Sequence, residues 1–91
     1  MNPKAASSID VELGRRLRVI RKTAGLSQEE MAEKIGISFQ QIQKYEWGTN
    51  RMSVARLVQI AAALDQPAST FIDGLEDHLG GAMGKAKRRA K

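Results

Sequence analysis

One face of a predicted short helix, residues 39–47, gathers the side chains with the most distinctive chemistry in this sequence. Helical spacing puts two glutamines, a lysine and a tryptophan together there: Gln40, Gln43, Lys44 and Trp47. In the DNA major groove a glutamine amide can pair with adenine N6 and N7, and a lysine can reach guanine O6 and N7. A globular domain has no structural reason to expose this set, so the pattern indicates a surface that contacts base edges.

Residues suited to catalysis or metal binding are scarce. The sequence has no cysteine and a single histidine, His78, which has no nucleophile beside it. The sequence contains no cluster with metal-ligand spacing, no glycine-rich phosphate loop and no pair of acids in an apolar setting. We therefore predict that the chain is not an enzyme and that it uses no metal ion or other cofactor.

Two short helices with a tight turn between them must position the polar face. Each follows a serine that can cap it, with a glutamate or glutamine three residues later to complete a capping box. Each also ends at a glycine, which accepts the left-handed conformation common at a helix C-terminus. The signals are Ser27, Glu30 and Gly36 around residues 28–35, and Ser38, Gln41 and Gly48 around residues 39–47. Helices joined so closely cross steeply, as in a helix-turn-helix.

Three further helices are predicted on either side of this pair. Asp10 is expected to cap the first, whose apolar residues recur at helical spacing. Ser53 is expected to cap the fourth, and Pro67 suits the first position of the fifth because that position needs no N–H donor. An earlier end of the fifth helix at Asp73 and Gly74 remains an alternative.

The run GLSQEEMAEKIGISFQQIQKYEWG resembles the helix-turn-helix of Cro/C1-type (XRE-type) transcriptional regulators, together with the preceding RLRVIRK and the following VARLVQIAAAL. The segment FQQIQKYEWGTNRMSVARL is most similar to the small stand-alone regulators of this family in alphaproteobacteria. The resemblance covers about residues 11–75. It implies an all-α fold, a compact five-helix lambda-repressor-like domain whose second and third helices form the helix-turn-helix.

The resemblance also implies which residues meet DNA. In this family the start of the third helix lies deepest in the major groove, which assigns base reading to Ser38, Phe39, Gln40, Gln43 and Lys44. Phosphate contacts are assigned to Ser27, Gln28, Asn50, Arg51 and Arg18. Three assignments keep a structural alternative: Phe39 as a core residue, Gln28 as an ordinary helix start, and Arg18 as part of a solvated surface row.

Two structural roles follow from the resemblance. The residues that are Arg21 and Glu46 here pair in the family, which would tie the first helix to the end of the third. The last helix provides the dimer contact, which points to Ile72, Leu75 and Leu79. Trp47 departs from the small or charged residue usual before this glycine, so its packing on deoxyribose, on the next loop or on a partner protein stays open.

Charge divides the chain into three parts. Residues 80–91 hold five of the fifteen lysines and arginines and no acid, and we predict a disordered basic tail there. Residues 1–9 are predicted to form a flexible N-terminal arm, and residues 10–79 the helix-turn-helix domain. Residues 1–79 carry ten basic and ten acidic side chains, so electrostatic attraction to DNA must come from the placement of charges.

These observations favour a sequence-specific, double-stranded DNA-binding transcriptional regulator. The simplest form is a repressor that binds an inverted repeat as a homodimer. The alternative is an antitoxin or anti-activator, a module with the same fold whose main task is to bind another protein through Trp47 and the basic tail. No apolar run approaches the roughly 20 residues that span a bilayer, and the N-terminus lacks a signal peptide, so we expect a soluble, cytoplasmic protein.

Overall fold

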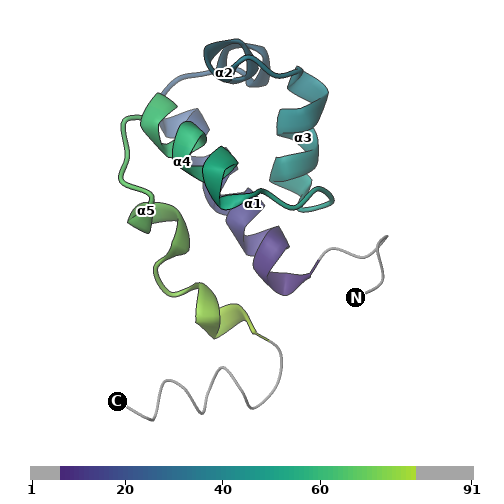
Figure 1. The fold of residues 1–91 in the computed structure, drawn as a ribbon, viewed down its shortest axis with the longest axis vertical. Coiled ribbons are helices and arrows are strands. Elements are labelled where there is room, and N and C mark those ends of the chain that lie inside the picture. The colour runs from purple at the N-terminus through teal and green to yellow at the C-terminus, as the bar shows by residue number, and fades with distance from the viewer. Residues whose placement is uncertain (1–6, 80–91) are drawn as a thin grey trace.

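The computed structural model describes residues 7–79, and these residues form helices and turns without any strand. The elements are α1 (Ser8–Thr23), α2 (Gln28–Ile35), α3 (Phe39–Trp47), α4 (Val54–Ala63), α5 (Ser69–Ile72) and a final 3₁₀ turn, η1 (Leu75–His78). Figure 1 shows α1 and α4 crossing the middle of the molecule, with α2 and α3 at one end and α5 toward the other. The all-α, five-helix fold is confirmed. The predicted tail, 80–91, and residues 1–6 of the predicted arm lie outside the described residues.

The predicted serine caps explain where three of the helices begin. The hydroxyl oxygens of Ser27, Ser38 and Ser53 each accept the backbone N–H three residues later, at 2.9, 3.2 and 3.0 Å. The first capping box is complete, because Glu30 Oε1 accepts the Ser27 N–H at 2.8 Å. The second is only half formed. The Gln41 amide does not reach back to Ser38 and instead donates to the Tyr45 hydroxyl at 3.0 Å.

The first helix begins earlier than the sequence prediction. Ser7 is its N-cap and accepts the Asp10 N–H at 3.1 Å, so Asp10 lies inside the first turn. The predicted cap at Asp10 is therefore wrong, and the domain begins before residue 10. The physical reason is that Ser7 and Asp10 stand three residues apart and form their own reciprocal pair, with the Ser7 hydroxyl donating to Asp10 Oδ2 at 2.6 Å.

The core lies between the helices, with α1 packed against α3, α5 and η1, and α4 packed against α2. Its fully buried large side chains come from five different helices: Leu17, Met31, Ile42, Ile60 and Phe71. Ala32 and Ala61 are also buried and let neighbouring helices approach closely. None of the helices in residues 7–79 has the length and apolar character needed to cross a membrane.

Glycines bring α1 into direct backbone contact with the end of α3. A Cβ added to Gly14 would stand 2.3 Å from the Tyr45 carbonyl oxygen and 2.6 Å from that of Glu46. At Gly48, which has a φ of 79°, a Cβ would stand 2.8 Å from the Val11 Cα. Side chains would not fit at either place, so this close contact fixes the orientation of α3 on α1.

The C-terminal segment differs from the predicted fifth helix. Pro67 lies before α5, which is a single turn and ends at Ile72, as the alternative at Asp73 and Gly74 had allowed. Gly74, with a φ of 77°, then turns the chain so that Leu75 enters the core and remains only 8% exposed. This placement contradicts the assignment of Leu75 to a dimer interface. Ile72 is 45% exposed and Leu79 is half-buried.

Candidate DNA interface

The third helix has two chemically different faces. Its inward face buries Ile42, Tyr45 and Glu46. On the outward side Gln40 and Lys44 are exposed and Gln43 is half-buried, and Ser38 is exposed at the N-cap. The predicted base-reading residues therefore lie mostly on the surface, as the helical spacing required. A rigidly held helix with exposed amide and ammonium groups is suited to direct readout in a major groove.

Phe39 lies between these two faces. It is half-buried and packs against the edge of the core. With Glu29, Glu33 and Ile37 it lines a shallow cavity of about 340 Å³ beside α2. The core alternative for Phe39 thus describes much of its packing, and only its remaining exposed edge is available to touch a base.

An ion pair joins the first helix to the end of the third, as the resemblance implied. The Arg21 guanidinium donates to Glu46 through Nε to Oε2 at 2.5 Å and through Nη2 to Oε1 at 3.1 Å, and both side chains are buried. Arg21 Nη1 also donates to the Leu26 carbonyl at 2.6 Å. The pair thereby connects α1, the start of α2 and the end of α3, which supports a structural role.

The Gln28 side chain belongs to the same network. Its Nε2 donates to Glu46 Oε1 at 3.0 Å, so the amide assigned to a phosphate is occupied by a protein partner in this structure. Gln28 remains the first residue of α2, where the helix N-terminus favours an anion. If Gln28 contacts a phosphate, the better donor is its main-chain N–H, because its side-chain amide already donates to Glu46.

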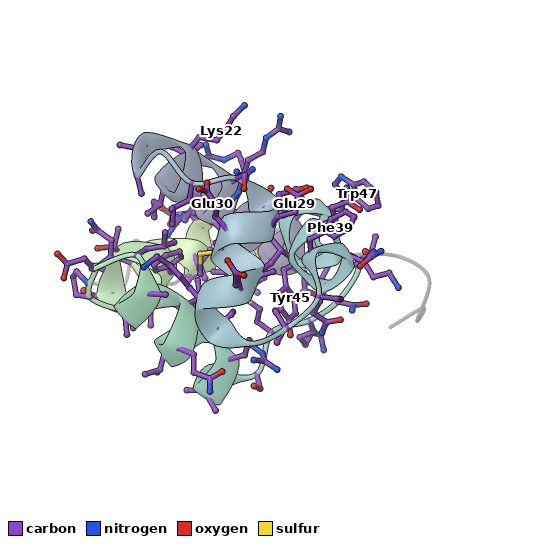
Figure 2. All side chains as sticks on the ribbon, turned by 90° about the horizontal axis from the view of Figure 1, so that it is seen from above. Lys22, Glu29, Glu30, Phe39, Tyr45 and Trp47 are labelled. Atoms are coloured by element: carbon purple, nitrogen blue, oxygen red, sulfur yellow. The ribbon has the colours of Figure 1, made fainter. Side chains whose placement is uncertain are left out.

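Three of the predicted phosphate-binding residues meet in one cleft. A cavity of about 420 Å³ is lined by Arg18, Ser27, Gln28, the buried Arg21–Glu46 pair and Trp47. Trp47 is 61% exposed and projects from the edge of the molecule (Figure 2). The cleft combines a cationic side chain, a helix N-terminus and an apolar wall, which together suit a phosphate and its attached sugar. The position of Trp47 beside Arg18 could not be read from the sequence, because α1 and α3 are distant along the chain.

The loop between α3 and α4 carries the other two predicted phosphate-binding residues. Asn50 is half-buried, and its Nδ2 lies 3.5 Å from Gln41 Oε1. Arg51, which was assigned to a phosphate contact, pairs in the structure with Asp10 of α1, with Nη2 3.0 Å from Oδ2. Burial alone would raise the pKa of Asp10, but hydrogen bonds from Arg51 and Ser7 outweigh it and lower this pKa.

A second ion cluster on α1 was missed entirely. Glu12 accepts hydrogen bonds from Arg15 at 2.8 Å and from Arg16 at 2.9 Å, which lower the pKa of its carboxyl to about 2. Arg16 also donates to the carbonyls of Phe71 and Asp73 at 3.0 and 2.6 Å, tying the C-terminal segment to α1. The four-residue spacing of Glu12 and Arg16 could have predicted their ion pair on a helix. The contact of Arg16 with residues 71 and 73 could not be predicted, because it joins segments that are distant in the sequence.

No group of three or more histidine, cysteine or acidic side chains within residues 7–79 is arranged to hold a metal ion. The side chains of the candidate site are hydrogen-bond donors and acceptors, cations, the Glu46 carboxylate and one indole, which suit contact with a polar, charged surface.

Comparison with known proteins agrees with this geometry. The family model described as "Helix-turn-helix" (HTH_3) matches residues 17–71, more than half of the chain. The chain belongs to this family. The helix-turn-helix chain is 45% identical over 80 residues to an "Uncharacterized HTH-type transcriptional regulator" of Sinorhizobium medicae, and 50% identical over 68 residues to an "Uncharacterized transcriptional regulator in ATPase CF(0) region" of Rhodospirillum rubrum.

These matches cover 88% and 75% of this helix-turn-helix chain but only 58% and 63% of the two relatives, so the chain spans less than two thirds of their length. The family and the names of these relatives confirm the predicted resemblance, including its alphaproteobacterial character, and support the prediction of a non-enzyme.

Solved structures show the same architecture. The restriction-modification controller protein C.AhdI from Aeromonas hydrophila superposes with a TM-score of 0.66 at 32% identity, covering 68% of this helix-turn-helix chain and 90% of C.AhdI. The biofilm regulator SinR, solved in complex with DNA, gives a TM-score of 0.63 at 31% identity, covering 67% and 98% of the two chains. The lambda-repressor-like fold is thus shared with proteins of the same helix-turn-helix type.

Proposed function

We propose that this helix-turn-helix protein binds a specific sequence of double-stranded DNA and regulates transcription, acting as a repressor. The main support for the proposal is that Gln40 and Lys44 are exposed on the outward face of α3, while the opposite face of this helix packs against α1. The membership of the family, and the solution of SinR in complex with DNA, support the same conclusion. Occupation of a promoter by the bound protein is the simplest way to prevent transcription. Because bacterial DNA lies in the cytoplasm, we place the protein there.

In this mechanism α3 enters the major groove from its N-terminal end. Gln40 would pair with adenine, Lys44 with guanine, and the exposed edge of Phe39 would touch a thymine methyl group. The cleft between Arg18, the start of α2 and Trp47 would hold a backbone phosphate and its sugar. The buried Arg21–Glu46 pair keeps the two parts in a fixed relation, so the phosphate contact sets the depth at which α3 reads the bases.

We further propose a homodimer on an inverted repeat. Two copies would place their α3 helices in successive major grooves, about 34 to 36 Å apart. Because Leu75 is part of the core, the contact between the two copies would depend on Ile72 and Leu79, the other two residues predicted for the dimer interface. Sedimentation of the free chain and of its complex with a two-half-site duplex would show whether two protein copies bind each duplex.

Selection of duplexes from a random DNA library at about 150 mM salt tests the function directly. The full chain and a version ending at Leu79 should both recover one motif with two-fold symmetry. Recovery of no motif, or loss of all binding without the tail, would contradict sequence reading by α3. Such a result would turn attention to Trp47 as a protein-binding residue. Reduced transcription in vitro from a promoter containing the motif would then test repression.

A further inference from the structure

An acidic residue outside the predicted site holds one of the residues assigned to DNA. Arg51 Nε lies 3.3 and 3.2 Å from the two carboxylate oxygens of Asp10, and its Nη2 lies 3.0 Å from Oδ2. The two side chains are unequally exposed, Arg51 to 62% and Asp10 to only 8%. The guanidinium therefore faces solvent on the loop after α3, whereas the carboxylate that holds it is almost enclosed.

The carboxylate is itself fixed in place. The Ser7 hydroxyl donates to Asp10 Oδ2 at 2.6 Å, and Asp10 lies in the first turn of α1. The next residue, Val11, is in backbone contact with Gly48 at the end of α3. Asp10 thus cannot follow Arg51 outward, and any movement of the guanidinium toward a phosphate would leave a nearly buried carboxylate without this partner.

We propose that Asp10 is a positioning residue that determines DNA specificity by restraining Arg51. This inference rests on the proposed function. An arginine held on Asp10 would meet a phosphate only at the position that the pair fixes, which in this proposal is the position it occupies when α3 reads its bases. An arginine without the Asp10 carboxylate would be held less firmly at this position and could reach phosphates in other registers. Asp10 therefore lowers affinity for random DNA more than affinity for the selected sequence.

The test compares binding to the selected duplex and to a random duplex over a series of salt concentrations. Asp10→Asn should bind random DNA about three- to tenfold more tightly, and the slope of log affinity against log salt should steepen by about one because Arg51 neutralises a further phosphate. Affinity for the selected duplex should rise by less than the affinity for random DNA, or fall. The ratio of the two affinities, which measures specificity, should decrease.

Two further variants separate positioning from a general charge effect. Because Asp10 acts through Arg51, Asp10→Asn combined with Arg51→Gln should bind both duplexes like Arg51→Gln alone. Asp65→Asn, at an exposed acid between α4 and α5, makes the same change in charge far along the chain and should leave the specificity ratio unaltered. Asparagine also accepts the positive φ of 57° at that position.

A last variant tests the pair from its exposed side. Arg51→Lys retains the charge but loses the bidentate hydrogen bonding to Asp10. It should therefore lower the specificity ratio without changing α1. Thermal unfolding would identify any variant that fails to fold. An unchanged ratio and slope in both Asp10→Asn and Arg51→Lys would overturn the inference, as would a charge effect that persists in the double variant. Failure of the unsubstituted chain to select any duplex would instead count against the proposed function.

Discussion

Adding a single methyl group at Gly14 should strongly destabilise the fold. A Cβ there would lie 2.3 Å from the Tyr45 carbonyl oxygen, whereas ordinary contacts of this kind begin at about 3.4 Å. The substitution Gly14→Ala must therefore move α1 away from the end of α3 by roughly 1 Å. The obstacle is backbone, so no side-chain rotation can relieve it.

The magnitude follows from two opposing effects. In an unobstructed helix, replacing glycine by alanine stabilises by about 1 kcal/mol. Forcing extra volume into a packed interface commonly costs about 1 to 3 kcal/mol, and here the same interface also holds the Arg21–Glu46 pair, whose geometry would be strained. Because the obstacle is backbone, we expect the upper end of this cost, which leaves a net loss of about 2 kcal/mol in the free energy of unfolding. For a domain of this size that corresponds to a fall in melting temperature of roughly 8 to 16 °C.

Urea and thermal unfolding followed by circular dichroism would measure this loss. Thr23→Ala is a suitable control, because Thr23 is exposed at the last position of the same helix and should accept alanine without penalty. If Gly14→Ala proved as stable as the original chain, the close backbone contact between α1 and α3 would be incorrect.

Three other predictions concern the ion pairs and the readout helix. Glu46→Ala should cost about 3 to 5 kcal/mol by leaving Arg21 buried without its carboxylate, and adding Arg21→Met should recover part of this in urea unfolding; no recovery would show that the unpaired charge of Arg21 is not the source of the loss. The pKa of Glu12 lies at about 2 in the folded state, below its ordinary value of 4.5, so its stabilisation is present above pH 4.5 and is lost as the pH falls toward 2. Glu12→Gln should therefore flatten the dependence of unfolding free energy on pH in that window, while parallel curves would contradict the assigned pairing with Arg15 and Arg16. Gln40→Ala should cost about 1 to 3 kcal/mol on the selected duplex and relax preference at one base pair, whereas equal losses on selected and random DNA would remove Gln40 from base reading.

Local signals in the sequence were sufficient for the helix-turn-helix itself. Capping by Ser27, Ser38 and Ser53 and termination at Gly36 and Gly48 depend on neighbouring residues only, and all five appear as expected. The start of α1 was missed although its signal was present, since Ser7 and Asp10 have the spacing of a capping pair. Two adequate capping residues so close together cannot be ranked without the packing of the first turn.

Contacts between distant segments were the least predictable features. The pair of Asp10 and Arg51 is separated by 41 positions, and the bond from Arg16 to the Asp73 carbonyl by 57. Nothing in local spacing identifies such partners, because they depend on how the helices pack. The burial of Leu75 has the same origin: its helical spacing could be recognised in the sequence, but the left-handed Gly74 turns Leu75 into the core of the domain.

The separation of the two faces of α3 has an evolutionary consequence. Gln40 and Lys44 are exposed, whereas Ile42, Tyr45 and Glu46 hold the helix in the fold. Exchanging only the exposed positions for those of another recognition helix should retarget the domain with little change in its folding. Duplicated genes for such a domain could thus acquire separate binding sites through a few substitutions, while the scaffold beneath them stays almost constant.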